Sequence, residues 1–174
     1  MRTRLSVVLD AARAAAILAL AAAWGSTLRA DDNRAMQITV APVTVAPGDM
    51  AEAVITIDID KEYRILGEPL PNKYSTTLTV TFDATRSLQP RAAILPDPKT
   101  FTESPEPFTY HAYDGTIVVK MPFKADEHAA PGDHTMHGRI RYQALIIDDA
   151  GLAGFLKTAV KLVDATIHVV PRKK

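Results

Sequence analysis

Apolar and polar residues alternate with a period of two in several short segments of this chain, and this pattern constrains the fold more than any other feature. In segment 53–60 the isoleucines occupy one phase, while the threonine and the aspartates occupy the other. Segments 75–82 and 116–123 repeat the pattern. Because successive side chains of a β-strand point to opposite faces, each segment predicts a strand with one buried face. The inward residues expected of segments 53–60 and 116–123 are Ile55, Ile57, Ile59, Ile117, Val119, Met121 and Phe123.

Turn signals separate these segments at intervals of roughly ten residues. Two of them are Ala-Pro-Gly-Asp, at 46–49 and 130–133, where proline presets φ and glycine tolerates a positive φ. No convincing amphipathic helix follows residue 30. About seven to nine strands of this kind predict an all-β chain folded as an antiparallel β-sandwich.

Four local features predict details of this sandwich. Asp114-Gly115 between two alternating runs predicts a tight hairpin of 108–113 with 116–123. Five prolines between residues 87 and 107 leave room for at most one short strand, near 92–95. The last strand, 159–170, changes its apolar phase at Asp164, which suggests a bulge. Residues 151–157 are compatible with one helical turn.

The segment 137–155 combines a clear strand with an unusual end. Ile140, Tyr142 and Ala144 alternate with arginine and glutamine, but Leu145-Ile146-Ile147 then breaks the alternation. An Asp-Asp-Ala-Gly turn follows, and Leu152 and Phe155 add apolar side chains to a region where a polar loop is expected. The segment therefore predicts a long hairpin whose end has a special role.

The motif Tyr142-Gln143-Ala144 followed by Asp148-Asp149, preceded by the turn at 130–133, resembles the N-terminal periplasmic domain of the thiol:disulfide interchange protein DsbD. The similarity extends over roughly residues 36–170. It implies an immunoglobulin-like β-sandwich. In that family two cysteines on this hairpin form a redox pair that is presented to thioredoxin-like domains, and the corresponding places here are about Leu145 and Leu152.

The chain contains no cysteine. Thiol–disulfide exchange, iron–sulfur clusters and cysteine-based zinc sites all require thiolate sulfur, so none of them can form in this chain. The family's redox chemistry therefore does not transfer with its fold. We expect a protein that is not an enzyme and has no cofactor.

Residues 1–30 have the features of a signal peptide or an N-terminal anchor. Three arginines precede the apolar run 14–24, which is short for a membrane span, and a small residue ends the segment. We expect export to the periplasm or another compartment outside the cytoplasm, with a β-sandwich domain at 31–174 that has no membrane span. Residues 1–30 hold four of the 20 basic and one of the 20 acidic residues, which leaves the domain a net charge of about −3 and argues against nucleic-acid binding.

A metal site is an alternative prediction. Imidazole and thioether ligands suit copper in an oxidising compartment, and His134, Met136 and His137 lie close together in the sequence. Strand geometry opposes the site, because His137 points away from the face shared by His134 and Met136. We therefore favour surface histidines with Met136 in the core. Further side chains that could approach are His111, His128, Met121 and Met50. The pair Asp58 and Asp60 is interpreted as two solvated charges.

The apolar end of the 137–155 hairpin leaves two interpretations open. Its side chains fold back and cap the sandwich, or they form an exposed surface that binds a protein partner. The second interpretation leads to our functional hypothesis: a non-catalytic, exported module acting by protein–protein contact, with a partner such as a thioredoxin-like or membrane redox protein. The candidate partner-binding residues are Leu145, Ile146, Ile147, Leu152 and Phe155.

Overall fold

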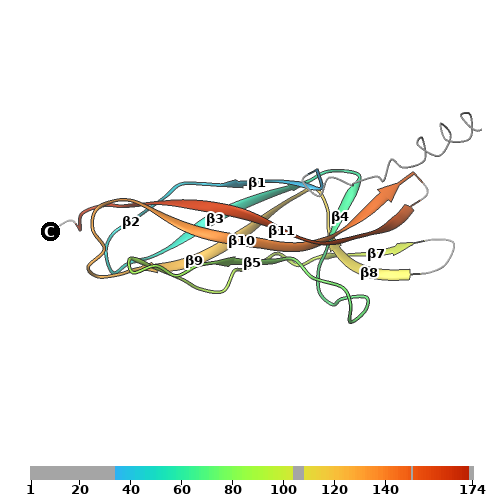
Figure 1. The fold of residues 1–174 in the computed structure, drawn as a ribbon, viewed down its shortest axis with the longest axis horizontal. Helices are drawn as coiled ribbons and strands as arrows, with labels where there is room; N and C mark the ends of the chain where they lie inside the picture. Colours follow the sequence, from blue (N-terminus) through green and yellow to red (C-terminus); the bar gives the residue numbers. More distant parts are fainter. Residues whose placement is uncertain (1–33, 104–107, 150, 173–174) are drawn as a thin grey trace, which may run out of the picture. The chain divides into compact units, whose positions relative to one another are not determined.

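The computed structural model describes residues 34–103, 108–149 and 151–172, and these residues form eleven β-strands. Figure 1 shows them arranged as two layers. The expected signal segment, residues 1–30, lies outside the described residues. In the described ranges there is no helix with the length and apolarity that crossing a membrane requires.

Two sheets make up the fold. The first contains four antiparallel strands in the order β1 (Met36–Val40), β3 (Met50–Ile59), β9 (Thr116–Ala125) and β6 (Leu88–Pro90). The second has the order β2 (Val43–Val45), β11 (Gly151–Val169), β10 (Gly132–Asp148), β4 (Tyr63–Leu66), β8 (Phe108–Tyr113) and β7 (Lys99–Glu103), and β5 (Thr79–Phe82) also pairs with β10. Only β2 and β11 pair in parallel among the described strands.

The main core lies between the two sheets and follows the alternation of the sequence. All seven inward residues expected of β3 and β9 are buried, and Met136, Ile140, Tyr142 and Ala144 of β10 face them. The structure therefore confirms the predicted all-β, immunoglobulin-like sandwich, with more strands than the seven to nine expected. The additional strands include β6 and β7, which lie in the proline-rich segment where at most one was expected. Both are edge strands, and an edge position tolerates a proline such as Pro90 because one side of the strand needs no partner.

The predicted hairpin across Asp114-Gly115 is wrong, although both of its strands form. β8 pairs with β4 and β7 in one sheet, whereas β9 pairs with β3 and β6 in the other. The turn therefore carries the chain from one sheet to the next. Gly115 has a φ of 61°, in the left-handed region that glycine adopts without strain. A tight turn fixes the reversal of the chain but does not fix which strand each arm pairs with.

Two predictions for β11 are also wrong. Residues 151–157 are extended and not helical. No bulge occurs at Asp164, which lies opposite His137 in regular register. Val160 and Leu162 simply face outward and are exposed, while Ala165, Ile167 and Val169 face the core. The change of apolar phase at Asp164 thus means that the apolar side chains lie on the outer face of β11 before this residue and on the core face after it. The register shifts lie instead between Gln143 and Leu145 and between Ile146 and Ile147.

Candidate functional site at the hairpin end

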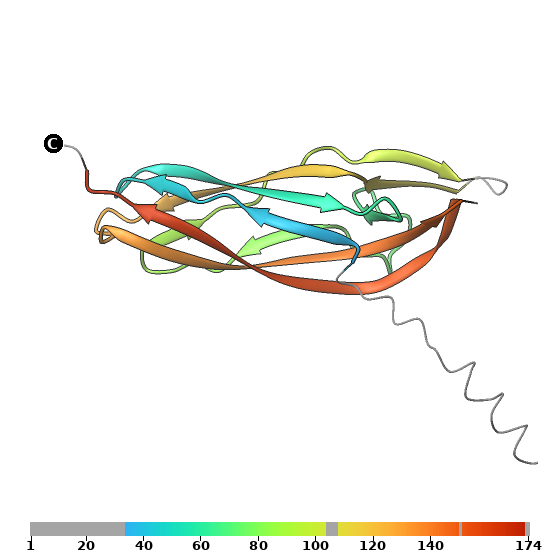
Figure 2. The same ribbon diagram turned by 90° about the horizontal axis from the view of Figure 1, so that it is seen from above.

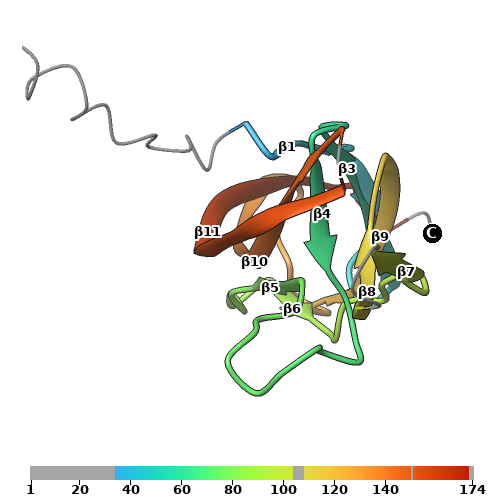
Figure 3. The ribbon, with the colours of Figure 1, turned by 90° about the vertical axis from the view of Figure 1, so that its right-hand side faces the viewer.

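The end of the β10–β11 hairpin, residues 145–155, is called the tip below. Figure 3 shows this end of the domain, where the hairpin lies near β4, β7 and β8. A second, smaller core holds the tip to those strands, and its buried residues are Leu66, Tyr110, Ala112 and Leu145. Leu70, Phe101, Phe108, Ile147 and Leu152 pack around them.

The alternation breaks at the tip because β10 has apolar neighbours on both of its faces there. Ala144 is buried in the main core, and its neighbour Leu145 is buried in the small core. Two adjacent residues of a strand normally face opposite sides, so both can be buried only where both faces of the strand are covered. Leu145 packs on this other face with Leu66 of β4 and with Tyr110 and Ala112 of β8, which belong to the same sheet. At Ala144 and Leu145, β10 therefore contributes to the main core and to the small core.

The structure places the five candidate residues in different environments. Leu145 is fully buried, so it contributes to the small core and not to any surface. Ile146, Ile147 and Leu152 are partly buried, and the last two pack on the small core. Phe155 is exposed, with 43% of its surface accessible. The tip thus combines both interpretations of the sequence: part of it caps the domain, and part of it remains on the surface.

An aromatic row extends from β7 to β11 beside the small core. The Tyr110 ring stacks between those of Phe101 and Phe108, with centroid distances of 5.7 and 5.5 Å. Phe155 meets the Phe108 ring edge-on at 6.2 Å and an interplanar angle of 72°. Offset-stacked and edge-to-face contacts are the favoured arrangements of aromatic pairs. The exposed Phe155 is therefore held in a defined orientation.

A polar cluster of Arg64, Glu103 and Tyr110 joins four strands below the tip. Glu103 Oε1 accepts hydrogen bonds from the Tyr110 hydroxyl at 2.6 Å and from Arg64 Nη1 at 2.8 Å. Arg64 Nη1 also donates to the Tyr110 hydroxyl oxygen, and the guanidinium carbon lies 3.8 Å from the Phe101 ring centroid. Glu103 Oε2 accepts a 3.2 Å hydrogen bond from the backbone N–H of Leu152. One carboxylate therefore connects β4, β7 and β8 to the start of β11.

The protonation states of the cluster fit a structural role. The hydrogen bond from Tyr110 is the largest effect that lowers the pKa of Glu103, and Arg64 acts in the same direction. Burial, followed by the hydrogen bond to Glu103, raises the pKa of Tyr110 to about 12. At neutral pH Glu103 is ionised and Tyr110 is protonated, and both pKa values lie far from the range that suits a general acid or base.

Sequence reasoning missed Arg64, Glu103 and the aromatic partners of Phe155. Arg64 and Glu103 are 39 residues apart, so no local spacing indicates their contact. A weaker signal was available for the aromatic row, because Phe108 and Tyr110 occupy alternate positions in β8 and Phe101 lies in the preceding strand. Their shared face became apparent only once β7 and β8 were known to pair.

The copper alternative finds no support in the structure. Met136 and Met121 are buried in the main core. His134 Nε2 lies 2.7 Å from the carbonyl oxygen of Ala130, and His137 Nδ1 lies 2.8 Å from Asp164 Oδ1. Nowhere in the described ranges do three or more His, Cys, Asp or Glu residues come close enough to hold a metal ion.

The paired aspartates of the sequence also have separate structural roles. Asp58 is exposed on β3 and accepts a 2.6 Å hydrogen bond from the Thr116 hydroxyl. Asp60 accepts a hydrogen bond from the backbone N–H of Glu62 in the following turn. Both carboxylates thus serve local structure, in agreement with the interpretation as surface charges.

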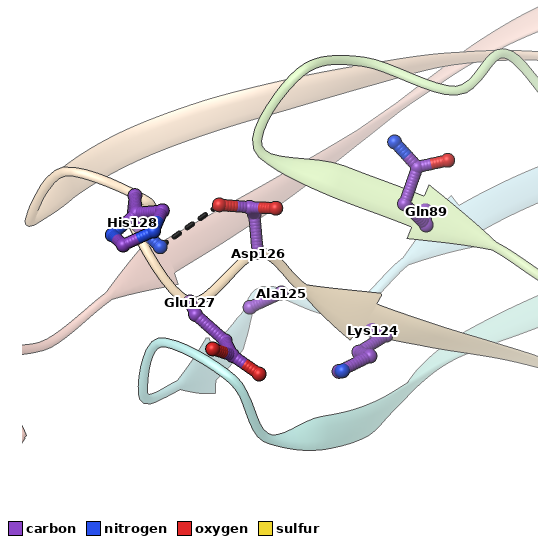
Figure 4. Close-up of a pocket in the computed structure, with 6 residues that line it drawn as sticks. All are labelled: Gln89, Lys124, Ala125, Asp126, Glu127 and His128. Carbon is purple, nitrogen blue, oxygen red and sulfur yellow. Dashed lines mark hydrogen bonds between the residues drawn. The ribbon is translucent and has the colours of Figure 1, made fainter.

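A small polar pocket lies where β6 and the end of β9 meet the next loop (Figure 4). Its lining residues are Gln89, Lys124, Ala125, Asp126, Glu127 and His128. Asp126 Oδ1 accepts a 2.8 Å hydrogen bond from the backbone N–H of His128, so this carboxylate stabilises the loop. We find no chemical role for the pocket.

Comparisons with known proteins identify no family by sequence: no family model and no curated protein matches the chain. Solved structures do match. The reduced N-terminal domain of DsbD from Neisseria meningitidis has 12% sequence identity and a TM-score of 0.45, with 79% of this chain and 93% of that chain covered. A type I cohesin of ScaB from Pseudobacteroides cellulosolvens has 10% identity and a TM-score of 0.45, with 80% and 94% covered.

The N-terminal periplasmic domain of ScsB from Proteus mirabilis also matches, with 7% identity, a TM-score of 0.44, and 77% of this chain and 45% of that chain covered. The resemblance to the DsbD domain, first seen in the sequence, is thus found by the structure comparison as well. At these identities the similarity concerns the fold and not the activity.

Proposed function

We propose that this chain is an exported, non-catalytic β-sandwich module that binds a protein partner through the exposed part of its tip. The single observation that carries the proposal is Phe155, a large aromatic side chain that is 43% exposed and yet fixed against Phe108. Ile146, Ile147 and Leu152 are partly exposed beside it in the sequence of the tip. Aromatic side chains in such positions supply much of the binding energy at protein interfaces.

The rigidity of the surroundings strengthens this reasoning. Binding a partner costs entropy when side chains and loops must be ordered, and the cost falls when the surface is already fixed. The aromatic row and the hydrogen bond between Glu103 and the backbone of Leu152 both restrict the tip. The partner therefore meets a surface of defined shape.

Two features of the sequence support the remaining parts of the proposal. Residues 1–30 have the composition of an export signal. The lack of cysteine means that the module binds without exchanging electrons with its partner. A thioredoxin-like domain or a membrane redox protein is the partner class that we propose on the basis of the sequence resemblance.

The docking proposal is tested with the full chain and a purified thioredoxin-like domain from the same organism, by calorimetry or a pull-down assay. Phe155→Ser should weaken the complex at least about tenfold, because it removes a large apolar contact. Val118→Ser is the matched control, because it removes an apolar side chain of similar exposure, 47%, from β9 in the other sheet. Equal binding by the wild type and Phe155→Ser would contradict docking at the tip. Ile147 is a poorer test position, because it packs on the small core.

The export proposal has its own test. Residues 1–30 are fused to a reporter enzyme that is active only outside the cytoplasm, and a fusion that starts after residue 30 is the control. Reporter activity that depends on residues 1–30 is expected. Activity that is the same for both fusions would contradict the proposal.

A further inference from the structure

The β10–β11 hairpin contains a β-bulge at the base of the tip. Figure 2 shows the two strands side by side, in orange and red. From Gln143 to Leu145, β10 advances by two residues, whereas β11 advances by three, from Thr158 to Phe155. β11 therefore has one residue more than β10 at this place, which is the arrangement of a bulge.

The burial of the neighbouring side chains locates the extra residue. Leu156 and Ala159 both pack against the main core, although they are three positions apart. Lys157 and Thr158, which lie between them, are both exposed. In a regular strand, the residues of one face are an even number of positions apart. Together with the register, this pattern places the extra residue at Lys157.

The bulge determines which face of the hairpin Phe155 occupies. Leu145 belongs to the small core, and Phe155 opposite it contacts Phe108, which packs on the same core. Regular pairing continued from Thr158 would instead place Phe155 opposite Ile146. A shift of one residue sends a side chain to the other face of a sheet, so Phe155 would then point away from Phe108.

The side chain of Gln143 binds the backbone at this bulge. Its Nε2 donates a 2.9 Å hydrogen bond to the carbonyl oxygen of Leu156. Its Oε1 accepts a 2.9 Å hydrogen bond from the backbone N–H of Thr76, which lies in the connection between β4 and β5. The hydroxyl oxygens of Thr76 and Thr158 are themselves hydrogen-bonded at 2.9 Å. One amide thus links the bulge to β10 and to a third segment of the chain.

These hydrogen bonds favour the bulged register over the regular one. A bulge interrupts the ladder between two strands, so its backbone groups need other partners, and the Gln143 amide is such a partner for Leu156. In the regular register Leu156 would lie opposite Leu145 and would leave the main core. The hydrogen bond from Gln143 would then be lost, and the packing of Leu156 with it.

We propose that Gln143 is the positioning residue of the tip: by holding the bulge, its amide keeps Phe155 on the face where the partner binds. The proposal rests on the function proposed for the tip, because Phe155 is the side chain that contacts the partner there. Gln143 is partly buried, and it acts on Phe155 through the backbone of β11.

NMR spectroscopy of the full chain without a partner tests the register. In the wild type, nuclear Overhauser contacts should join Phe155 to Leu145 and to the ring of Phe108. In Gln143→Ala these contacts should weaken, and contacts between Phe155 and Ile146 should appear. Unchanged contacts of Phe155 would overturn the proposal, even if the variant has a lower Tm.

Gln89→Ala is the matched control for this measurement. The Gln89 amide also donates to a backbone carbonyl oxygen, that of Thr85 at 2.6 Å, but it lies on β6 in the other sheet. Its loss should leave the contacts of Phe155 as they are in the wild type. Equal changes in Gln89→Ala and Gln143→Ala would overturn the proposal, because the effect would then not depend on the bulge.

Deletion of Lys157 tests the bulge directly. Without this residue, regular pairing continued from Thr158 already places Phe155 opposite Leu145. The deletion should therefore keep the wild-type contacts of Phe155, and Gln143→Ala should no longer change them in this background. A change of the same size with and without Lys157 would overturn the proposal, since Gln143 would then act by another route.

Binding of the thioredoxin-like domain provides the functional measurement. Gln143→Ala should weaken it about threefold or more, because only molecules with Phe155 in place bind, and deletion of Lys157 in the same chain should restore it. Phe155→Ser separates the two proposals. If Phe155→Ser binds like the wild type, docking at the tip is contradicted, and the NMR contacts alone decide the role of Gln143. If Phe155→Ser weakens binding and Gln143→Ala does not, the positioning role is overturned and docking at the tip stands.

Discussion

Substitution of Glu103 by glutamine provides the sharpest test of how the tip is held. The wild-type carboxylate accepts hydrogen bonds from Tyr110 and Arg64 and from the backbone N–H of Leu152. Glutamine keeps one acceptor oxygen, but its amide group offers a donor where an acceptor is needed, and the ion pair with Arg64 is lost. Hydrogen bonds to charged groups contribute about 1.5–3 kcal/mol each when buried.

The expected cost is smaller than the sum of these bonds. The side chains of Arg64 and Glu103 remain 21% and 17% exposed, so water partly replaces the lost contacts, and neighbouring bonds are not additive. We expect a loss of about 2 kcal/mol in the free energy of unfolding, which corresponds to a decrease in Tm of about 4–8 °C for a domain of this size. Thermal unfolding followed by circular dichroism measures it. Hydrogen exchange at the Leu152 amide should also become faster.

The pH dependence of this difference in stability shows whether the ionised carboxylate of Glu103 is responsible for it. The pKa of Glu103 is lowered from its ordinary value of 4.5, so its stabilisation is present above that value and is lost as the pH falls through the folded pKa. The difference in stability between wild type and Glu103→Gln should therefore shrink below about pH 4.5. Glu52→Gln is the control, because Glu52 lies 3.6 Å from Lys120 in an exposed pair and should matter by less than about 0.5 kcal/mol. A Tm change no larger than that of Glu52→Gln, or a difference that persists in acid, would refute the reasoning.

Three further predictions concern packing and the buried tyrosine. Gly138→Ala should destabilise the domain by about 1–3 kcal/mol, because the new methyl carbon would lie 2.7 Å from the ring of Phe82. Gly154→Ala is the control and should have little effect, because no atom lies within 4 Å of its new methyl carbon. Thermal unfolding of the two variants measures the difference, and equal Tm values would contradict the prediction. Leu145→Ala should cost about 2–5 kcal/mol by denaturant unfolding if the small core is packed as described, and a loss below about 1 kcal/mol would contradict that packing. The raised pKa of Tyr110 means that its stabilisation is complete below pH 10 and is lost as the pH rises through about 12, so Tyr110→Phe should remove one late step from the alkaline absorbance titration.

The faces of the strands were predictable from the sequence, whereas the partners of the strands were not. A period of two follows from the backbone of a single strand, and it assigned Ile55, Val119 and Tyr142 to the core correctly. Pairing depends on distant segments. Asp114-Gly115 has the composition of a hairpin turn, yet it joins two sheets, since β8 pairs with β4 in one sheet and β9 pairs with β3 in the other. The fold class could thus be derived residue by residue, but the topology required the structure.

The candidate site was predictable in the same partial way. Leu145 and Phe155 were identified as candidates because apolar side chains are not expected at the end of a hairpin. The structure shows that a second, smaller core lies at this end. The sequence could not separate the buried Leu145 from the exposed Phe155, since both are simply apolar. Glu103 gave no signal at all, because its role depends on Arg64, which is 39 residues away. Polar contacts between residues that are far apart in the sequence cannot be predicted from its periodicity or its composition.

Glu103→Gln should affect the tip and leave the rest of β11 unchanged. Loosening the tip by this substitution frees the start of β11 at Leu152, and the aromatic row then fixes Phe155 less firmly, so partner binding at the tip should weaken. Regular pairing with β10 holds residues 158–169, where Val160 lies opposite Arg141. Hydrogen exchange should therefore become faster at the Leu152 amide and stay unchanged at the amides of residues 158–169. A parallel increase along the whole strand would mean that β11 opens as one unit, and that the polar cluster does not hold the tip separately.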